Sequence, residues 1–161
     1  MLKILIEKLC LKKICDIFVE SFRMAKLDTY HNDVIVALQK DGWTITHDQM
    51  TINWEDDRYY PDLGAERVIA ATKGLEKIAV EIKSFSSGSL NSDFYEALGQ
   101  YDTYTMALKE LEPERKVVLA VSMDTFNTFF KRKSVLKIIE IKKLRILVYN
   151  FIDQTVEKWI N

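Results

Sequence analysis

Apolar residues recur at helical spacing along residues 1–23 of the chain. Charged side chains interrupt them throughout, which excludes the unbroken apolar stretch of a signal peptide. The spacing predicts one amphipathic helix. Three interpretations are open: a helix docked on the domain, a helix on a membrane surface, or an extension upstream of a natural start at Met24. The acidic residues of the segment make the membrane interpretation the weakest. The apolar positions are Leu2, Leu5, Leu9, Ile14, Ile17 and Phe18.

From Met24 onward, helical and strand patterns alternate. Periodic apolar positions predict a helix that ends near Gly42, a long helix over residues 93–111 capped by Asn91 or Ser92, and a third through residues 135–142. Residues 48–61 have no period and are expected to be irregular. The order predicts a mixed α/β sheet flanked by helices, as a single domain over residues 24–161 with residues 1–23 as a helical extension. Strands are expected over residues 43–47, 67–71, 77–85, 116–123, 145–150 and 155–160.

Composition and charge narrow the class of protein. The 161 residues include 23 Lys and Arg and 24 Asp and Glu, which gives a net charge of −1. This balance excludes a polybasic protein held to nucleic acid by bulk charge, but it allows a local basic groove. Two cysteines cannot form a disulfide framework and suit a reducing compartment. Since no apolar stretch of about 18 residues occurs, we expect a cytoplasmic protein with no membrane association.

Charged residues gather on one face of a predicted hairpin. The strands over residues 67–71 and 77–85 are joined by a turn that we place at Gly74 and Leu75, which sets Glu66 opposite Lys83. Side chains alternate between the faces of a strand, so several acids and one lysine would lie together. A charge inside an apolar strand costs folding free energy unless an opposite charge pairs with it, so such charges are paired or have a function. The residues expected on this face are Asp62, Glu66, Val68, Glu81 and Lys83.

The spacing of these charges resembles the PD…ExK pattern of the restriction-endonuclease-like nucleases. Pro61 and Asp62 precede the first strand, and Glu81 and Lys83 lie within the second. Two carboxylates suit Mg²⁺ or Mn²⁺, because hard cations prefer oxygen ligands. The metal lowers the pKa of a bound water, and the lysine orients that water and offsets charge at phosphorus. Glu66 is either a further metal ligand or a cross-strand partner of Lys83.

Two positions on the predicted helices extend this pattern. Gln100 and Tyr104 lie four residues apart, hence on one helix face, and resemble the QxxxY element of RecB-like nucleases. His31 lies eleven residues before Gly42, about where archaeal Holliday-junction resolvases place a metal-binding glutamate. Two interpretations of His31 stay open: a metal ligand, or an ordinary helix histidine.

Five longer segments extend the resemblance: MAKLDTYHNDVIVALQKDGWTITHD, DLGAERVIAATKGLEKIAVEIKSF, ALGQYDTY, EPERKVVLAVS and VEKWI. Together they resemble the XisH family, cyanobacterial proteins described as controlling factors for excision of the fdxN DNA element during heterocyst development. The resemblance implies a restriction-endonuclease-like fold and a role in DNA rearrangement beside a site-specific recombinase, with the small protein XisI as companion. Carried over by position, it implies that Asp62, Glu66, Glu81, Lys83 and Gln100 are the family's polar motif residues.

The primary hypothesis is a Mg²⁺-dependent endonuclease acting on DNA in element excision. In it Asp62 and Glu81 bind metal, Lys83 positions water and Gln100 supports the site. The alternative is a non-catalytic subunit that binds XisI or the recombinase through its sheet edge or residues 48–61. A nuclease restrained by its companion is a third hypothesis, and a homodimer is an open arrangement. Lys131, Arg132 and Lys133 form a short basic cluster that either contacts phosphate or is a solvated face.

Overall fold

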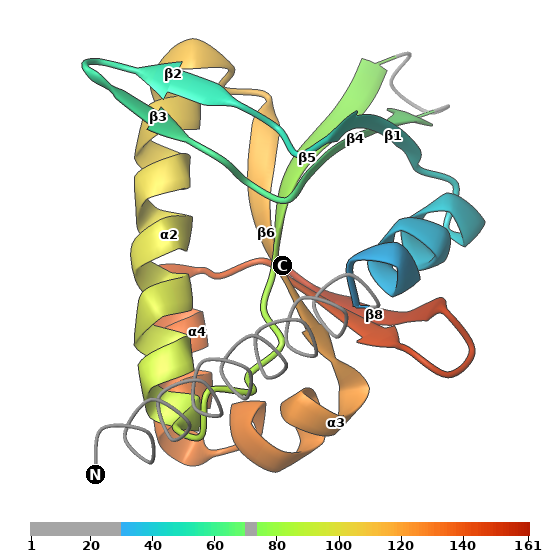
Figure 1. Ribbon diagram of the computed structural model, residues 1–161, viewed down its shortest axis with the longest axis vertical. Coiled ribbons are helices and arrows are strands. Elements are labelled where there is room, and N and C mark those ends of the chain that lie inside the picture. The colour runs from blue at the N-terminus through green and yellow to red at the C-terminus, as the bar shows by residue number, and fades with distance from the viewer. Residues whose placement is uncertain (1–29, 70–73) are drawn as a thin grey trace, which may run out of the picture.

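A six-stranded mixed sheet forms the centre of the computed structural model, which describes residues 30–69 and 74–161 (Figure 1). The sheet order is β1-β4-β5-β6-β7-β8. The pairs β5–β6 and β6–β7 are parallel, and the other neighbours are antiparallel. The strands are β1 (Thr44–Asp48), β4 (Leu63–Ile69), β5 (Gly74–Ile82), β6 (Arg115–Ser122), β7 (Ile146–Asn150) and β8 (Thr155–Ile160).

Helices cover both faces of this sheet, and each face has its own core. The helix over residues 30–40 packs on one face, where Val34, Leu38 and Trp43 are buried. The long helix α2 (Leu90–Leu111) covers the other face, together with α4 (Lys133–Lys142) and the π-helical turn η1 (Phe126–Phe130) that follows α3 (Met123–Thr125). Figure 1 shows the sheet between α2 and the helix over residues 30–40. The predicted mixed α/β sheet flanked by helices is confirmed.

The segment expected to be irregular contains a hairpin, so that prediction was wrong. Strands β2 (Ile52–Trp54) and β3 (Asp57–Tyr59) pair with each other outside the main sheet and lie on α2. The Trp54 indole N–H donates to Glu110 Oε2 at 3.0 Å, and the rings of Tyr59 and Tyr104 lie 6.4 Å apart. These strands are three residues long, too short for a period-two pattern to be recognised.

The register of the β4–β5 hairpin also differs from the prediction. Gly74 and Leu75 belong to β5, opposite Ile69 and Val68, and Glu66 lies opposite Lys77. The predicted turn at Gly74 and Leu75 and the Glu66–Lys83 pair are therefore wrong. The partner of Glu66 changes from residue 83 to residue 77, an even number of positions. The charged side chains therefore keep the sheet face that the alternation assigned to them.

Helix α2 begins earlier than predicted. It starts at Leu90, and the side chain of Ser89 caps it by accepting from Ser92 N at 3.3 Å, so Asn91 and Ser92 are not the caps. The predicted extension over residues 1–23 lies outside the described residues. Within the described part of the chain, no helix is long and apolar enough to cross a membrane.

Candidate functional site

Two carboxylates meet where β4 begins and β5 ends, on the sheet face that α2 covers. Leu63 pairs with Val80. Asp62 directly precedes Leu63, and Glu81 directly follows Val80, so the two acids are the next opposed positions of the hairpin. The Asp62 carboxylate accepts a hydrogen bond from the backbone N–H of Ile82 at 2.7 Å, which ties it across the hairpin. The predicted neighbours Asp62 and Glu81 are thus brought together.

Of the two acids, Glu81 has the more strongly raised pKa. It is 6% exposed, and its Oε2 has no hydrogen-bond partner among the described residues. Burial, reinforced by the nearby charge of Asp62, raises the pKa of Glu81 to about 8. Burial also raises the pKa of Asp62 above its usual range. A buried carboxylate oxygen without a partner is costly, so the site is short of positive charge.

Helix α2 brings its polar residues to the same place. Hydrogen bonds link the Tyr104 hydroxyl to the Glu81 carboxylate and to the Gln100 side chain. Gln100 Oε1 is itself buried with no partner in the described part of the chain. The predicted Gln100–Tyr104 face therefore points at Glu81. Tyr104 was noted only as half of a motif, and its hydrogen bond to Glu81 gives it a place in the site.

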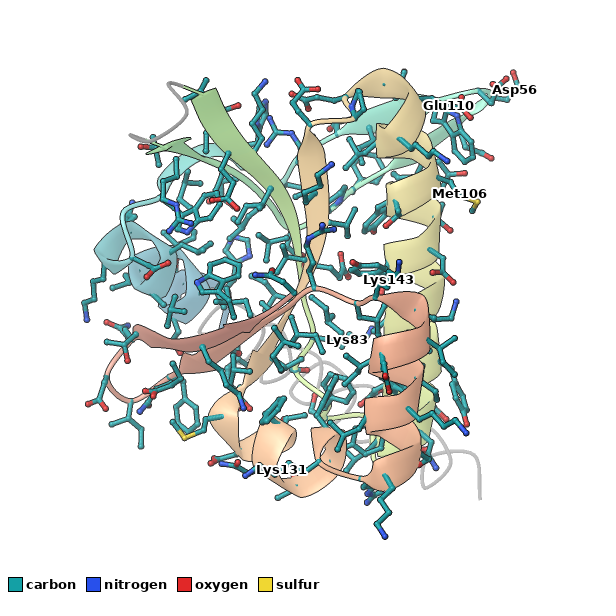
Figure 2. All side chains as sticks on the ribbon, turned by 180° about the vertical axis from the view of Figure 1, so that it is seen from behind. Asp56, Lys83, Met106, Glu110, Lys131 and Lys143 are labelled. Atoms are coloured by element: carbon teal, nitrogen blue, oxygen red, sulfur yellow. The ribbon has the colours of Figure 1, made fainter. Side chains whose placement is uncertain are left out.

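A lysine directly after β5 completes the predicted set. The strand was predicted to extend to residue 85, but β5 ends at Ile82, so Lys83 lies just outside it. Lys83 Nζ lies 2.7 Å from Glu96 Oε1 on α2, and the side chain of Lys83 is 17% exposed. Its charge lowers the pKa values of both Asp62 and Glu81 but does not outweigh their burial. Figure 2 shows Lys83 beside α2. Among the described residues, Lys83 is thus the lysine beside the two inner carboxylates, Asp62 and Glu81, and it already has an exposed partner in Glu96.

His31 lies at the margin of this site. Its Nε2 is 2.6 Å from Asp48 Oδ1, and both charges act on the pKa of Asp62. Asp48 is a residue that sequence reasoning missed. It lies in β1, 17 positions from His31, and no local pattern links the two.

Glu66 lies elsewhere, and neither interpretation given for it from the sequence describes its contacts. Its Oε1 is 3.0 Å from Arg115 Nη2 and 3.9 Å from Lys77 Nζ. It shares a sheet face with Glu81 but pairs with these cations rather than with Lys83. Glu66 belongs to a separate ion-pair cluster.

Comparison with known proteins identifies the family of this chain. The family model described as XisH protein matches residues 24–157. The chain belongs to the XisH family. This confirms the resemblance inferred from the sequence segments, which began at Met24. None of the curated proteins compared with the chain matches it.

Solved XisH family structures share the fold. A crystal structure of an XisH family protein from Nostoc punctiforme is 38% identical, covers 83% of this chain and 99% of that chain, and superimposes with a TM-score of 0.75. A crystal structure of an fdxN element excision controlling factor protein from Anabaena variabilis is 39% identical, with the same coverage and TM-score. The domain described above is therefore the domain of these XisH proteins.

The residues of this XisH domain fit a magnesium ion. Among residues 30–69 and 74–161, no three His, Cys, Asp or Glu side chains gather closely enough to hold a metal by themselves. Mg²⁺ is commonly held by only one or two carboxylates, while waters and substrate phosphates complete its octahedron. Asp62 and Glu81 supply that number, and the unpartnered Glu81 Oε2 is an oxygen that a cation would satisfy.

Proposed function

We propose that this XisH family member hydrolyses phosphodiester bonds of DNA with Mg²⁺ or Mn²⁺ during excision of a DNA element. The Anabaena variabilis relative is described as a controlling factor of fdxN element excision. The pattern of Asp62, Glu81 and Lys83 on a hairpin further supports a place in the PD-(D/E)xK nuclease superfamily. The observation that carries the proposal is the buried Glu81 carboxylate, which faces a second acid and keeps one oxygen without a partner.

Each residue has a defined role in this proposal. Asp62 and Glu81 would hold the metal, which when bound supplies a water of lowered pKa and polarises the phosphate. Lys83 would orient the attacking water and offset the charge that develops at phosphorus. The water oxygen would bond to phosphorus and release a proton to solvent, while the bond between phosphorus and the leaving oxygen breaks and that oxygen takes up a proton from solvent. Gln100 and Tyr104 would hold Glu81 in place from α2.

A titration with a matched control tests the proposal. Calorimetry with Mg²⁺ and Mn²⁺ should detect stoichiometric binding to the wild type and loss of binding in Glu81→Gln. On supercoiled and branched DNA, Glu81→Gln and Lys83→Met should each cleave about 100-fold or more slowly. Glu66→Gln changes an acid on the same sheet face but outside the site, and it should retain metal binding and cleavage.

Absence of both metal binding and cleavage in the wild type, alone and with a companion of the XisI type, would overturn the nuclease proposal. Equal losses in Glu66→Gln and Glu81→Gln would also contradict it, since the effect would then not belong to the site.

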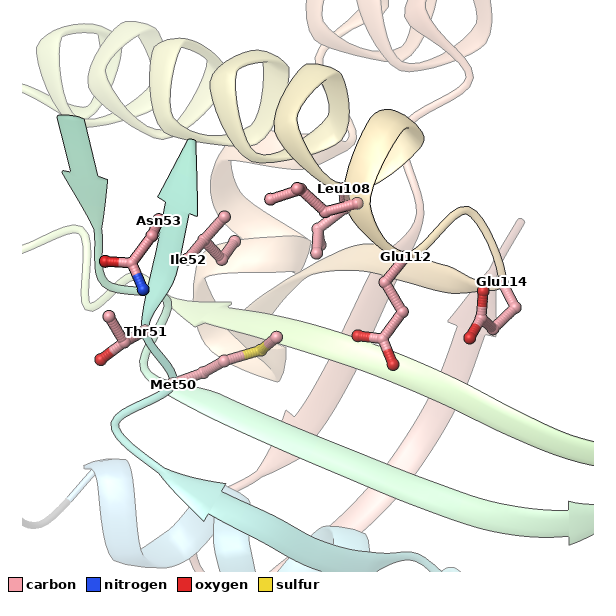
Figure 3. A pocket seen from close by; sticks show the side chains of 8 residues that line it. Met50, Thr51, Ile52, Asn53, Leu108, Glu112 and Glu114 are labelled. Carbon is pink, nitrogen blue, oxygen red and sulfur yellow. The ribbon is translucent and has the colours of Figure 1, made fainter. Parts of the chain in front are cut away.

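A surface groove favours a second candidate function, that of a protein-binding subunit. The groove is about 420 Å³ and lies between β2 and the end of α2 (Figure 3). Met50, Ile52 and Leu108 form an apolar floor, while Leu111 is 54% exposed at its side. Exposed apolar surface with a polar rim is typical of protein contacts. The candidate partners are a companion of the XisI type and a site-specific recombinase.

The groove can be tested independently of cleavage. Leu111→Asp should weaken binding of a purified companion at least tenfold in a co-purification or calorimetric assay. Leu136→Asp alters a similarly exposed leucine on α4 and should leave that binding unchanged. Equal affinity of the two variants would contradict the assignment of the groove.

A further inference from the structure

Basic residues are concentrated in one short part of the chain. Residues 131–145 contain seven of the 23 Lys and Arg residues but only one of the 24 Asp and Glu residues. Because the whole chain has a net charge of −1, the remainder is acidic and this segment is a local positive region. Its basic residues are Lys131, Arg132, Lys133, Lys137, Lys142, Lys143 and Arg145.

The cations at the start of this segment are exposed and unneutralised. Lys131, Arg132, Lys133 and Lys137 are all exposed, and none forms an ion pair within the described residues. Arg132 instead stacks on the ring of Phe129, with its guanidinium carbon 4.8 Å from the ring centroid. By contrast, Lys77 and Lys83 near the sheet and Lys142 at the end of α4 each have a carboxylate partner.

The position of these cations does not favour the stability of the helix. Arg132 is the N-cap residue of α4, with no side-chain cap hydrogen bond, and the first turn contains no acid. Positive charge near a helix N-terminus opposes the helix dipole. The inward face of α4 is formed by Val135 and Ile139, so the core does not require cations here. A ligand of negative charge would reverse this unfavourable arrangement.

Aromatic contacts fix the start of the basic segment beside the end of β5. Phe85 lies two residues after Lys83, and its ring is 5.9 Å from Phe129 and 5.3 Å from Phe130. Phe129 in turn carries Arg132. Figure 2 shows Lys131 beside the helical turn η1, which precedes α4, and Lys143 at the end of α4. The unneutralised cations therefore lie toward the end of β5, where the carboxylate pair also lies.

We propose that Lys131, Arg132, Lys133 and Lys137 bind the phosphate backbone of double-stranded DNA. Regularly spaced phosphates attract an exposed group of lysines through release of counterions. An anionic membrane is the weaker fit, because α4 has only Leu136 and Ile141 as exposed apolar side chains, while Val135 and Ile139 are buried in the core. The inference deepens the proposed function by naming the surface that would hold its substrate, but it concerns binding and does not require cleavage.

Binding of a short DNA duplex in EDTA tests the surface without cleavage. Fluorescence anisotropy with a labelled 20-base-pair duplex would compare the wild type with the triple variant Lys131→Gln, Lys133→Gln and Lys137→Gln. We expect at least tenfold weaker binding at low salt. The slope of log K against log salt concentration should fall in magnitude by about 2.7, since each neutralised phosphate contributes about 0.9.

A matched control removes the same kind of charge elsewhere. Lys109→Gln with Lys116→Gln changes two exposed lysines and should leave the salt slope equal to that of the wild type. Thermal unfolding should give the triple variant a melting temperature no lower than that of the wild type, because its changes relieve the N-terminus of α4. If the triple variant does not fold, the single variant Lys137→Gln replaces it in the assay, and its slope should fall in magnitude by about 0.9.

Several results would overturn the inference: no DNA binding by the wild type, equal losses in the control variant, or tighter binding to phosphatidylserine vesicles than to DNA. Failure of the nuclease proposal looks different. A wild type that binds DNA through these lysines but never cleaves it with Mg²⁺ or Mn²⁺ would refute the nuclease and leave the surface intact.

Discussion

Two charged clusters lie on the same face of the β4–β5 hairpin, and they differ in how their charges are matched. Around Arg115, which is 3% exposed, every nearby carboxylate has a cation. Arg115 donates to Glu66 at 3.0 Å and to the carbonyl of Ile78 at 2.9 Å, while Lys77 lies 3.0 Å from Glu112. The hydrogen bond from Arg115 holds the pKa of Glu112 below its usual range.

Around Glu81 the balance is reversed. Burial and the charge of Asp62 raise the pKa of Glu81, and one carboxylate oxygen is left without a partner among the described residues. Lys83, the lysine whose charge acts on both acids, is paired with Glu96. A matched cluster stabilises the apo protein by itself, whereas an unmatched one stores a cost that a bound cation would relieve. The comparison therefore separates a structural cluster from a candidate functional one.

The largest effect on stability is expected from breaking the matched cluster. Arg115→Met should lower the free energy of unfolding by about 3–5 kcal/mol, because it leaves Glu66 and Glu112 without their main cation. Urea unfolding measures this. A loss below about 1 kcal/mol would show that Lys77 alone can balance both acids, and the contrast between the clusters would then fail.

An intermediate effect is expected from changing pH at the unmatched cluster. Because the pKa of Glu81 is raised to about 8, the folded protein keeps a proton on it up to about pH 8, whereas the unfolded chain releases that proton near the ordinary pKa of 4.5. Between these values unfolding releases a proton, so stability falls as pH rises, by at most about 1.4 kcal/mol per pH unit.

Glu81→Gln should remove this dependence. Urea unfolding in EDTA at pH 5, 6, 7 and 8 would compare it with the wild type and with Glu66→Gln, whose slope should match the wild type. Identical slopes for all three proteins would show that Glu81 is already ionised in the fold, and the cluster would no longer count as unmatched.

The smallest effect is expected at the exposed end of the unmatched cluster. Glu96 is 61% exposed where it meets Lys83, and exposed ion pairs contribute less than about 1 kcal/mol. Glu96→Gln should therefore change the free energy of unfolding by less than about 1 kcal/mol. A larger loss, in the range expected for Arg115→Met, would mean that Lys83 depends on Glu96 as Glu66 and Glu112 depend on Arg115.

Much of the fold followed from local sequence patterns. Apolar periodicity predicted the three longer helices and the six main strands, because burial of one face imposes a period that neighbouring residues reveal. The hairpin β2–β3 was missed because strands of three residues carry no such period. Its position depends on Trp54 and Tyr59 packing on α2, contacts that span about 50 residues of sequence.

The candidate site followed from sequence only in part. Asp62, Glu81, Lys83 and Gln100 were predicted as neighbours and are brought together, whereas Glu66 was grouped with them and belongs to the Arg115 cluster. Because successive side chains of a strand point to opposite faces of the sheet, the sequence predicted which of these residues share a face, even though the predicted register was wrong. The register itself decided which residues lie opposite one another, and no local signal near the hairpin turn specified it.

The sequence by itself determined the order of the elements, the residue types of the site and the family, since each rests on local period or on matched segments. The tertiary structure alone decided which charges are neutralised. The partners of Glu66, Glu81 and His31 come from strands and helices distant in the chain. Burial and charge pairing depend on all neighbours in space, and a linear pattern does not contain them.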